Sequence, residues 1–248
     1  MTATRTAFSL ALCAAMALGA PAMASANDVP PGDPCGDGSG TGTGNPCEGN
    51  NGNDGANGNA GFTFEEIAVP DEDRRGAFIS QIGAGNEASA EQAGTSSYAR
   101  VIQSGTDNTA TLTQGDGNHF ATIAQDGEAN SAVVGQEGSG QSVLALAQQG
   151  TANSAQVSQT EAEAIYSAAM ISQSGAGNAL ILVQDGSDNQ ARLTQSGEDN
   201  LMTATQLGTG NRLEWTQDGN GLSDLQITQD GGQAMQITQT NTGGSGGM

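Results

Sequence analysis

Lysine is absent from this chain of 248 residues, and aromatic residues make up only 3% of it. The six basic residues are all arginine and face 27 acidic residues, which gives a formal net charge of −21. This charge disfavours binding to nucleic-acid phosphates, which need cationic partners, and to anionic lipid headgroups. With one histidine and no lysine, the usual groups for acid–base, Schiff-base and nucleophilic catalysis are scarce. The composition therefore predicts neither an enzyme nor a nucleic-acid-binding protein, and it indicates no catalytic residue and no cofactor.

Long hydrophobic runs are also missing, and the one apolar run near the start is too short to span a bilayer. Arg5, the apolar stretch 8–18 and the small residues Ala24-Ser25-Ala26 together have the pattern of a secretory signal peptide. We expect residues 1–26 to be removed by cleavage after Ala26, with Ala24 as the alternative site. The mature chain is then exported through the periplasm, without membrane insertion.

Cysteine is scarce as well, and of the three residues Cys13 lies in the predicted signal. Cys35 and Cys47 remain, and a local disulfide is the default for such a pair in an exported chain. Two thiolates without a nearby histidine cannot complete a tetrahedral zinc site, so no metal site is predicted.

Residues 27–76 are dominated by glycine, asparagine and other small polar residues and contain almost nothing to bury. This composition predicts a disordered export or linker segment. Near its end, Phe62, Phe64, Ile67 and Val69 form a short apolar patch, which we interpret as a docking strand.

What the sequence does contain is a repeat marked by glutamine. Ten of the fourteen intervals between the marker glutamines are eleven residues, and the others are 10, 12, 12 and 14. The markers are Gln81, Gln92, Gln103, Gln114, Gln125, Gln136, Gln148, Gln159, Gln173, Gln184, Gln195, Gln206, Gln217, Gln229 and Gln239. Self-similarity at a fixed period is the signature of a repeat architecture.

Each repeat unit has an internal pattern of glycine and asparagine. Glycine follows the marker by two residues in twelve of fourteen units: Gly83, Gly94, Gly105, Gly127, Gly138, Gly150, Gly175, Gly186, Gly197, Gly208, Gly219 and Gly231. Asparagine follows it by five in eight units: Asn86, Asn108, Asn130, Asn153, Asn178, Asn189, Asn200 and Asn211. In the first half these asparagines occur in every second unit, with Ser97, His119, Gln141 and Ala164 at the same place in the units between.

The pattern within a unit is that of a strand followed by a turn. From Asn108 to Gln114, amide and apolar side chains alternate with threonine, which is the period of a strand with one buried face. An eleven-residue period also fits a right-handed coiled coil, but a glycine in nearly every unit would cost about 1 kcal/mol each in a helix. We predict an all-β fold over residues 77–239. It is a parallel two-sheet β-solenoid of stacked strand-turn-strand repeats, with about seven two-strand rungs, behind a disordered N-terminal segment and before a flexible tail at 240–248.

Inward-facing amides explain why such a chain would stack. A buried amide without a partner costs a few kcal/mol, but identical amides one rung apart can hydrogen-bond in a continuous ladder. The glutamines and asparagines are therefore the predicted structural and self-assembly residues, and the glycines are the predicted turn residues. We see no polar cap after Gln239, and an uncovered strand edge is a template for another copy.

The full unit, Gln-x-Gly-x-x-Asn-x-Ala-x-x-x-Gln, resembles the curlin repeat of bacterial curli fibres. The units that begin at Gln103, Gln125 and Gln184 match it throughout, and the resemblance covers about residues 77–239. It implies a major or nucleator subunit of an extracellular amyloid fibre that supports adhesion and biofilm. It also implies a second curlin-type subunit and an outer-membrane export pore as partners, with residues 27–76 in the place of the segment that addresses the chain to the pore.

A secreted monomeric solenoid that binds calcium, a polysaccharide or ice is the alternative. Turns such as Asp116-Gly117-Asn118 offer oxygen ligands, and a threonine precedes the marker in six units. Against calcium, the chain lacks the nonapeptide of calcium β-rolls. The acidic residues Asp126, Asp185, Glu198, Asp199 and Asp218 fall in the predicted turns, where like charge slows premature association.

Overall fold

The computed structural model describes residues 64–69, 75–94, 96–161 and 165–241. The expected signal peptide, most of segment 27–76, Cys35, Cys47 and residues 242–248 of the expected tail lie outside these ranges. Every regular element in the described part of the chain is a strand, and no helix there could cross a membrane.

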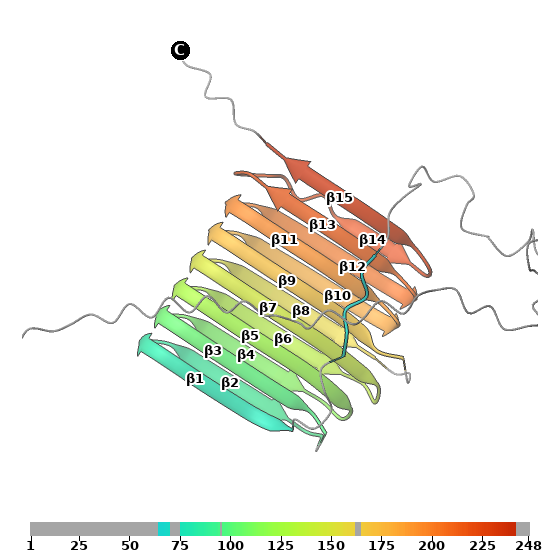
Figure 1. The fold of residues 1–248 in the computed structure, drawn as a ribbon, viewed down its shortest axis with the longest axis horizontal. Coiled ribbons are helices and arrows are strands. Elements are labelled where there is room, and N and C mark those ends of the chain that lie inside the picture. The colour runs from blue at the N-terminus through green and yellow to red at the C-terminus, as the bar shows by residue number, and fades with distance from the viewer. Residues whose placement is uncertain (1–63, 70–74, 95, 162–164, 242–248) are drawn as a thin grey trace, which may run out of the picture. The chain divides into compact units, whose positions relative to one another are not determined.

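The fifteen strands alternate between two parallel sheets (Figure 1). Sheet A has eight strands in the order β1-β3-β5-β7-β9-β11-β13-β15, and sheet B has seven in the order β2-β4-β6-β8-β10-β12-β14. Their bounds are β1 Gly76–Ala84, β2 Glu87–Gln92, β3 Tyr98–Thr106, β4 Thr109–Gln114, β5 Asn118–Glu128, β6 Ser131–Glu137, β7 Gln141–Thr151, β8 Ser154–Thr160, β9 Ser167–Ala176, β10 Ala179–Ser187, β11 Gln190–Glu198, β12 Leu201–Thr209, β13 Arg212–Asp218, β14 Ile227–Asp230 and β15 Ala234–Thr240. This is the predicted β-solenoid, so the fold class is confirmed.

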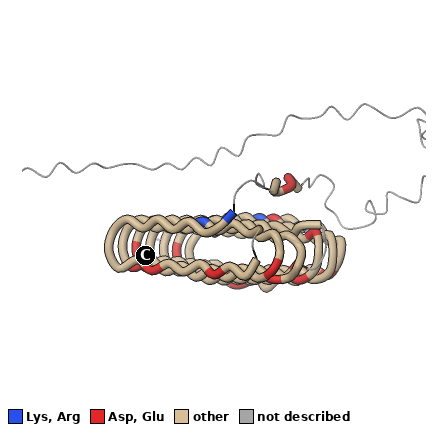
Figure 2. The backbone as a smooth tube through the Cα atoms, turned by 90° about the horizontal axis from the view of Figure 1, so that it is seen from below, with Lys and Arg blue, Asp and Glu red and all other residues tan. Residues whose placement is uncertain are grey.

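The register keeps equivalent residues of successive coils directly above one another. In sheet A, Gln81 pairs with Gln103 and Gln103 with Gln125, and sheet B repeats this from Gln92 to Gln114. Units of 12 and 14 residues do not break the register, because the extra residues are taken up in the turns and the markers Gln148 and Gln173 still align. Figure 2 shows the coils one behind another as a flattened tube.

Small and branched apolar side chains fill the space between the sheets. The core runs from Ala99 and Val101 near one end to Leu213 and Trp215 near the other, and all four are fully buried. Alanine alternates with Leu, Ile or Val along most strands, so that two closely spaced sheets can bury one large side chain per strand. A single unit could not offset its backbone entropy with so little apolar surface, so only stacked neighbours make each unit stable.

Two local predictions are wrong. Several strands continue past the marker glutamine, so Asp126, Asp185, Glu198 and Asp218 are exposed near strand ends, and of the five predicted acidic residues only Asp199 lies in a turn. Residues 64–69 join neither sheet as a strand. They contact the outer face of sheet A through side chains and single hydrogen bonds.

Candidate functional site: amide ladders and stack ends

Two continuous ladders of glutamine side chains run along the interior, one against each sheet. In sheet A, each Nε2 donates to the Oε1 of the next marker at 2.7–2.9 Å, from Gln81 to Gln239 without a gap. Sheet B repeats this from Gln92 to Gln229, also at 2.7–2.9 Å. Each of the thirteen donating amides therefore finds its acceptor in a copy of itself one rung away.

The second hydrogen of the interior amides joins the two sheets. Gln125 Nε2 also donates to Thr109 O of sheet B at 3.0 Å, and Gln136 Nε2 donates to Phe120 O of sheet A at 3.1 Å. The interior glutamines are at most 2% exposed, so an unpaired amide there would be costly. Both hydrogens of these amides are used, one along the stack and one across it.

Asparagine forms a third ladder at the turn that leads from sheet A to sheet B. Asn86, Asn108, Asn130, Asn153, Asn178 and Asn200 are joined by Nδ2–Oδ1 hydrogen bonds of 2.9–3.0 Å. Their donors point toward the N-terminal end, whereas the glutamine donors point toward the C-terminal end. Each ladder thus has a direction, and the two ends of the stack differ chemically.

The opposite turn, from sheet B to sheet A, has a mixed column. Asn189 and Asn211 form one ladder step there, with Nδ2 to Oδ1 at 2.9 Å. Ser97 and His119 lie below them in this column as predicted, and the His119 N–H donates to Ser97 Oγ at 3.2 Å. The predicted place of Gln141 is wrong, because Ser142 pairs in register with His119. Ser167 continues this column, and Ala164 lies outside the described residues. The 12- and 14-residue units displace these positions by one and three residues.

His119 is a member of this column whose buried polar atoms are not all hydrogen-bonded within the described residues. Its ring is fully buried, its Nε2 lies 3.1 Å from Asp116 O, and its Nδ1 and the Ser142 Oγ have no hydrogen-bond partner in the described part of the chain. Burial lowers the pKa of His119 below its usual value of 6.5, against the opposing effect of the Asp116 carbonyl. At neutral pH the folded chain therefore holds this ring in its neutral form.

This shift predicts a loss of stability in mild acid. With a folded-state pKa below 6.5, the unfolded chain binds more protons, so stability falls as pH drops below about 6.5. We expect the melting temperature of the native chain to fall more between pH 7.5 and 5.5 than that of His119→Asn, which cannot titrate. Parallel melting curves for the two proteins would contradict this reading of His119.

Most of the predicted turn glycines are required by the close approach of successive coils, whereas an added Cβ on Gly94, Gly208 or Gly231 would have no neighbour closer than 3.2 Å. Eleven of the twelve predicted turn glycines have positive φ, and Gly94 alone does not. A Cβ placed on Gly127, where φ is +125°, would lie 2.0 Å from the Gly150 carbonyl oxygen, and Gly105 and Gly150 have the same close contact with the glycine above. These positions therefore exclude every side chain, through both conformation and space.

Glu161 is a buried group that the repeat pattern did not indicate. Its carboxylate accepts hydrogen bonds from Ser167 Oγ at 2.7 Å and Ser187 Oγ at 2.8 Å, and the residue has no exposed surface. It stands where other units have the turn glycine, in the 14-residue unit between Gln159 and Gln173. That irregular interval is the one sequence signal that marked this place.

The stack ends in open strand edges. β1 and β2 form one end, where Phe78, Ile79 and Gln81 are exposed, and β14 and β15 form the other. Met235 and Ile237 at the second end are only half-buried although they continue the core. Among the described residues, no strand pairs with the outer edges of these four strands, so both ends present core positions and backbone groups of the kind that template a further strand.

In the paired strands that the structure describes, no acidic side chain lies directly above another. Asp126 and Asp218 share one outer column of sheet A, but Gln149, Ser174 and Ser196 lie between them. Like charges directly opposite each other destabilise a sheet, and this spacing avoids that cost. Figure 2 shows acidic residues at the bends of the tube.

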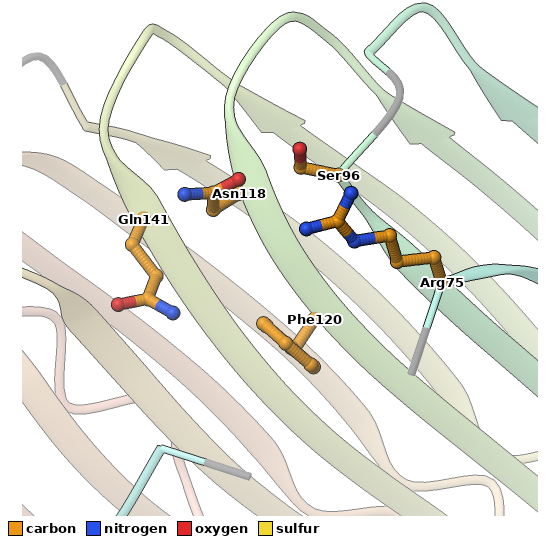
Figure 3. Close-up of a pocket in the computed structure, with 5 residues that line it drawn as sticks. All are labelled: Arg75, Ser96, Asn118, Phe120 and Gln141. Carbon is orange, nitrogen blue, oxygen red and sulfur yellow. The ribbon is translucent and has the colours of Figure 1, made fainter. Parts of the chain in front are cut away.

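The described residues contain little that could bind a small ligand. A cavity lined by Arg75, Ser96, Asn118, Phe120 and Gln141 has a volume of about 40 Å³, which is room for a few water molecules (Figure 3). Within the described ranges, no group of three His, Cys, Asp or Glu residues could hold a metal ion.

The six threonines that precede a marker do not form one array. Thr113, Thr205 and Thr228 lie in sheet B, and Thr194, Thr216 and Thr238 lie in sheet A. Neither face therefore presents a full row of the kind that ice binding needs.

Two stretches of the chain match the family model described as the curlin associated repeat, at residues 83–117 and 186–219. Each stretch holds three consecutive marker glutamines at eleven-residue spacing and the turns between them. No curated protein matches the chain, and no solved structure does either.

Proposed function

The chain belongs to the curlin-repeat family, and we propose that it is a secreted fibre subunit that polymerises end to end into an amyloid-like surface filament. A curli-type structural role agrees with a solenoid whose buried polar groups are used for stacking. In this proposal the filament supports adhesion and the biofilm matrix. The chain reaches the surface through an outer-membrane pore addressed by residues 27–76, and a second curlin-type subunit is a partner.

The observation that carries the proposal is the complementarity of the two ends. At the C-terminal end, Gln239 Nε2 has only a long contact of 3.5 Å to Ser223 O, so it has a hydrogen to donate. At the N-terminal end, Gln81 Oε1 has no donor among the described residues. Because every step of the ladder runs from Nε2 to Oε1 toward the C-terminus, a second copy would continue it in the same direction. Stacking would thus pair two groups that have no short hydrogen bond of this kind among the described residues.

At the C-terminal end of the stack, sheet A extends one strand beyond sheet B. This difference determines how the end of one copy can join the start of the next, a contact that we call the joint. Sheet A has one strand more than sheet B, because β15 has no described partner in the facing sheet. In the proposed joint, β15 pairs with β1 of the next copy, with Gln239 over Gln81, at the usual strand spacing of about 4.8 Å. β14 and the next copy's β2 are then separated by the width of one strand, so the ladder continues across the joint in sheet A and is interrupted in sheet B.

Solid-state NMR on fibres tests this joint. Fibres are grown from a mixture of chains labelled only with ¹⁵N and chains labelled only with ¹³C, so that ¹⁵N–¹³C signals report contacts between copies. We expect fibres to form, and we expect a contact from Gln239 Nε2 to the Gln81 side chain without one from Gln229 to Gln92. The second pair serves as the internal control for the strand-wide separation in sheet B.

Two results would count against the proposal. A chain that stays monomeric under varied salt and pH would favour the monomeric solenoid. Contacts between residues of the same number, such as Gln148 with Gln148, would mean that each copy forms a single layer of the fibre, contrary to end-to-end stacking.

A further inference from the structure

The outer face of sheet A is apolar in its middle and polar toward its C-terminal strands. Phe120, Val143 and Ala168 follow one another in register on β5, β7 and β9, and Met170 lies two residues beyond Ala168. The next strands along the sheet continue these columns with Gln190, Arg192 and Arg212. We call Phe120, Val143, Ala168 and Met170 the outer patch. Phe120, Val143 and Ala168 are each at most 4% exposed, although they lie on the outside of the solenoid.

Residues 64–69, which we call the strap, cover the outer patch. The Ile67 side chain is only 6% exposed and clusters with Phe120, Val143 and Ala168. Phe64 and Val69 are partly buried in the same cluster. Figure 1 draws the strap in teal.

Polar groups beside the outer patch hold the strap in one register. The Ile67 N–H donates to Gln190 Oε1 at 2.9 Å, and the single hydrogen of the Tyr166 hydroxyl is shared between Ile67 O at 2.9 Å and Glu66 Oε1 at 2.8 Å. Arg192 pairs with the Glu65 carboxylate at 3.7 Å and donates to the Glu65 carbonyl at 3.2 Å. The apolar side chains of the strap thus meet the apolar strands, and its acids meet Tyr166 and Arg192.

The Tyr166 hydroxyl remains a donor well above neutral pH. Burial, followed by the hydrogen bond to Glu66 and its charge, raises the pKa of Tyr166 to about 12. The contacts to Glu66 and Ile67 O are therefore maintained throughout the neutral range.

No described segment covers the outer face of sheet B, where apolar side chains are exposed but interrupted by polar ones. Val133 lies between Thr111 and Gln156 in its column, and Ile181 lies between Gln156 and Thr203. A flat sheet face with a contiguous apolar patch is a surface on which a second sheet packs, whereas single exposed apolar side chains between polar ones are ordinary on a protein surface. The strap covers the face whose composition favours such packing.

We propose that the strap keeps the outer patch from pairing face to face with the outer patch of a second copy, so that copies join only through their ends. The first half of this statement concerns the monomer alone, and the second half rests on the proposed end-to-end assembly. The occupant of the outer patch is thus residues 64–69 of the same chain. A second copy is the occupant that the strap excludes.

The test compares Ile67→Asp with Ala68→Asp in the full chain. Both variants add one carboxylate to the strap, but Ile67 is buried on the outer patch whereas Ala68 is exposed. Hydrogen exchange of the strap amides reports whether the strap is docked, and sedimentation of freshly prepared monomer reports pairing. For Ile67→Asp we expect exchange protection of the strap to fall by roughly tenfold or more, as the loss of one buried aliphatic side chain implies, together with formation of dimers. Ala68→Asp is expected to stay protected and monomeric.

A second variant shows which surface pairs. Adding Val143→Thr and Met170→Gln to Ile67→Asp makes the outer patch polar, and we expect the protein to return to monomer. Dimers that persist in this triple variant would overturn the proposal, as would an Ile67→Asp protein that loses strap protection and remains monomeric. Equal behaviour of Ile67→Asp and Ala68→Asp would also overturn it, and so would an unprotected strap in the native chain. If the native chain formed no fibres, the end-to-end proposal would fail, while the sedimentation result would still decide the role of the strap.

Discussion

Replacing Gly127 by alanine is expected to destabilise the solenoid by about 4 kcal/mol or more, a loss confined to strained or overpacked sites. The added Cβ would lie 2.0 Å from the Gly150 carbonyl oxygen, and the φ of +125° is one that alanine avoids. Relief requires the two coils to separate, which would weaken the register of the glutamine ladder between Gln125 and Gln148. Urea unfolding of the monomer measures the loss, and we expect fibre growth from this variant to be slowed as well.

Gly135→Ala is the matched control. Gly135 lies in β6 with no atom within 4 Å of an added Cβ and without a positive φ, so alanine fits there. We expect a change within about 0.5 kcal/mol, or a small gain, because glycine weakens a strand interior. Similar losses in both variants would mean that glycine at the turn is not required by the approach of the coils.

The sequence was sufficient for the fold class because three signals agreed. The glutamine spacing indicated a repeat, the alternation between Asn108 and Gln114 indicated strands, and Gly105 and its equivalents marked the turns. In a solenoid, each coil contacts only its neighbours, so a local pattern that repeats is enough to specify the whole.

The irregular units show where this reasoning reached its limit. Counting five residues from each marker gave Gln141 and Ala164, but the structure places Ser142 and Ser167 in the column. The register is set by pairing of whole strands, and extra residues collect in the turn, so counting from one side of a turn fails when the turn grows. Glu161 was missed because its partner Ser187 lies in the following coil, 26 residues away, and counting within one unit does not show such a contact.

The strap could be found in the sequence only as an apolar patch. Phe64 and Ile67 indicated that the segment docks somewhere, but its site depends on which outward columns of sheet A are apolar over several coils. The members of one such column lie more than 20 residues apart in the chain, as Phe120, Val143 and Ala168 do. Partners such as Gln190 Oε1, 123 residues beyond Ile67, are set by the stacked fold alone.

The fold and the proposed function depend on the same claim, which is that inward amides obtain their partners from copies of themselves along the stack. Gln148 and its neighbour Gln149 allow a direct test, because Gln148 is 2% exposed inside the ladder whereas Gln149 points to solvent. Gln148→Leu removes the acceptor of Gln125 Nε2 and the donors of Gln173 Oε1 and Ser131 O. Orphaned buried polar groups cost about 1–3 kcal/mol each, partly offset here by the added leucine surface, so we expect a net loss of about 3 kcal/mol.

The decisive measurement is the unfolding free energy of Gln148→Leu against that of Gln149→Leu, taken in urea on the monomer. Both variants make the same chemical change one residue apart, and the exposed one is expected to stay within about 0.5 kcal/mol of the native chain. A loss of about 3 kcal/mol for Gln148→Leu alone is the predicted result. Equal stability of the two variants would contradict the account, because apolar packing without the amide ladder would then be enough to hold the coils together.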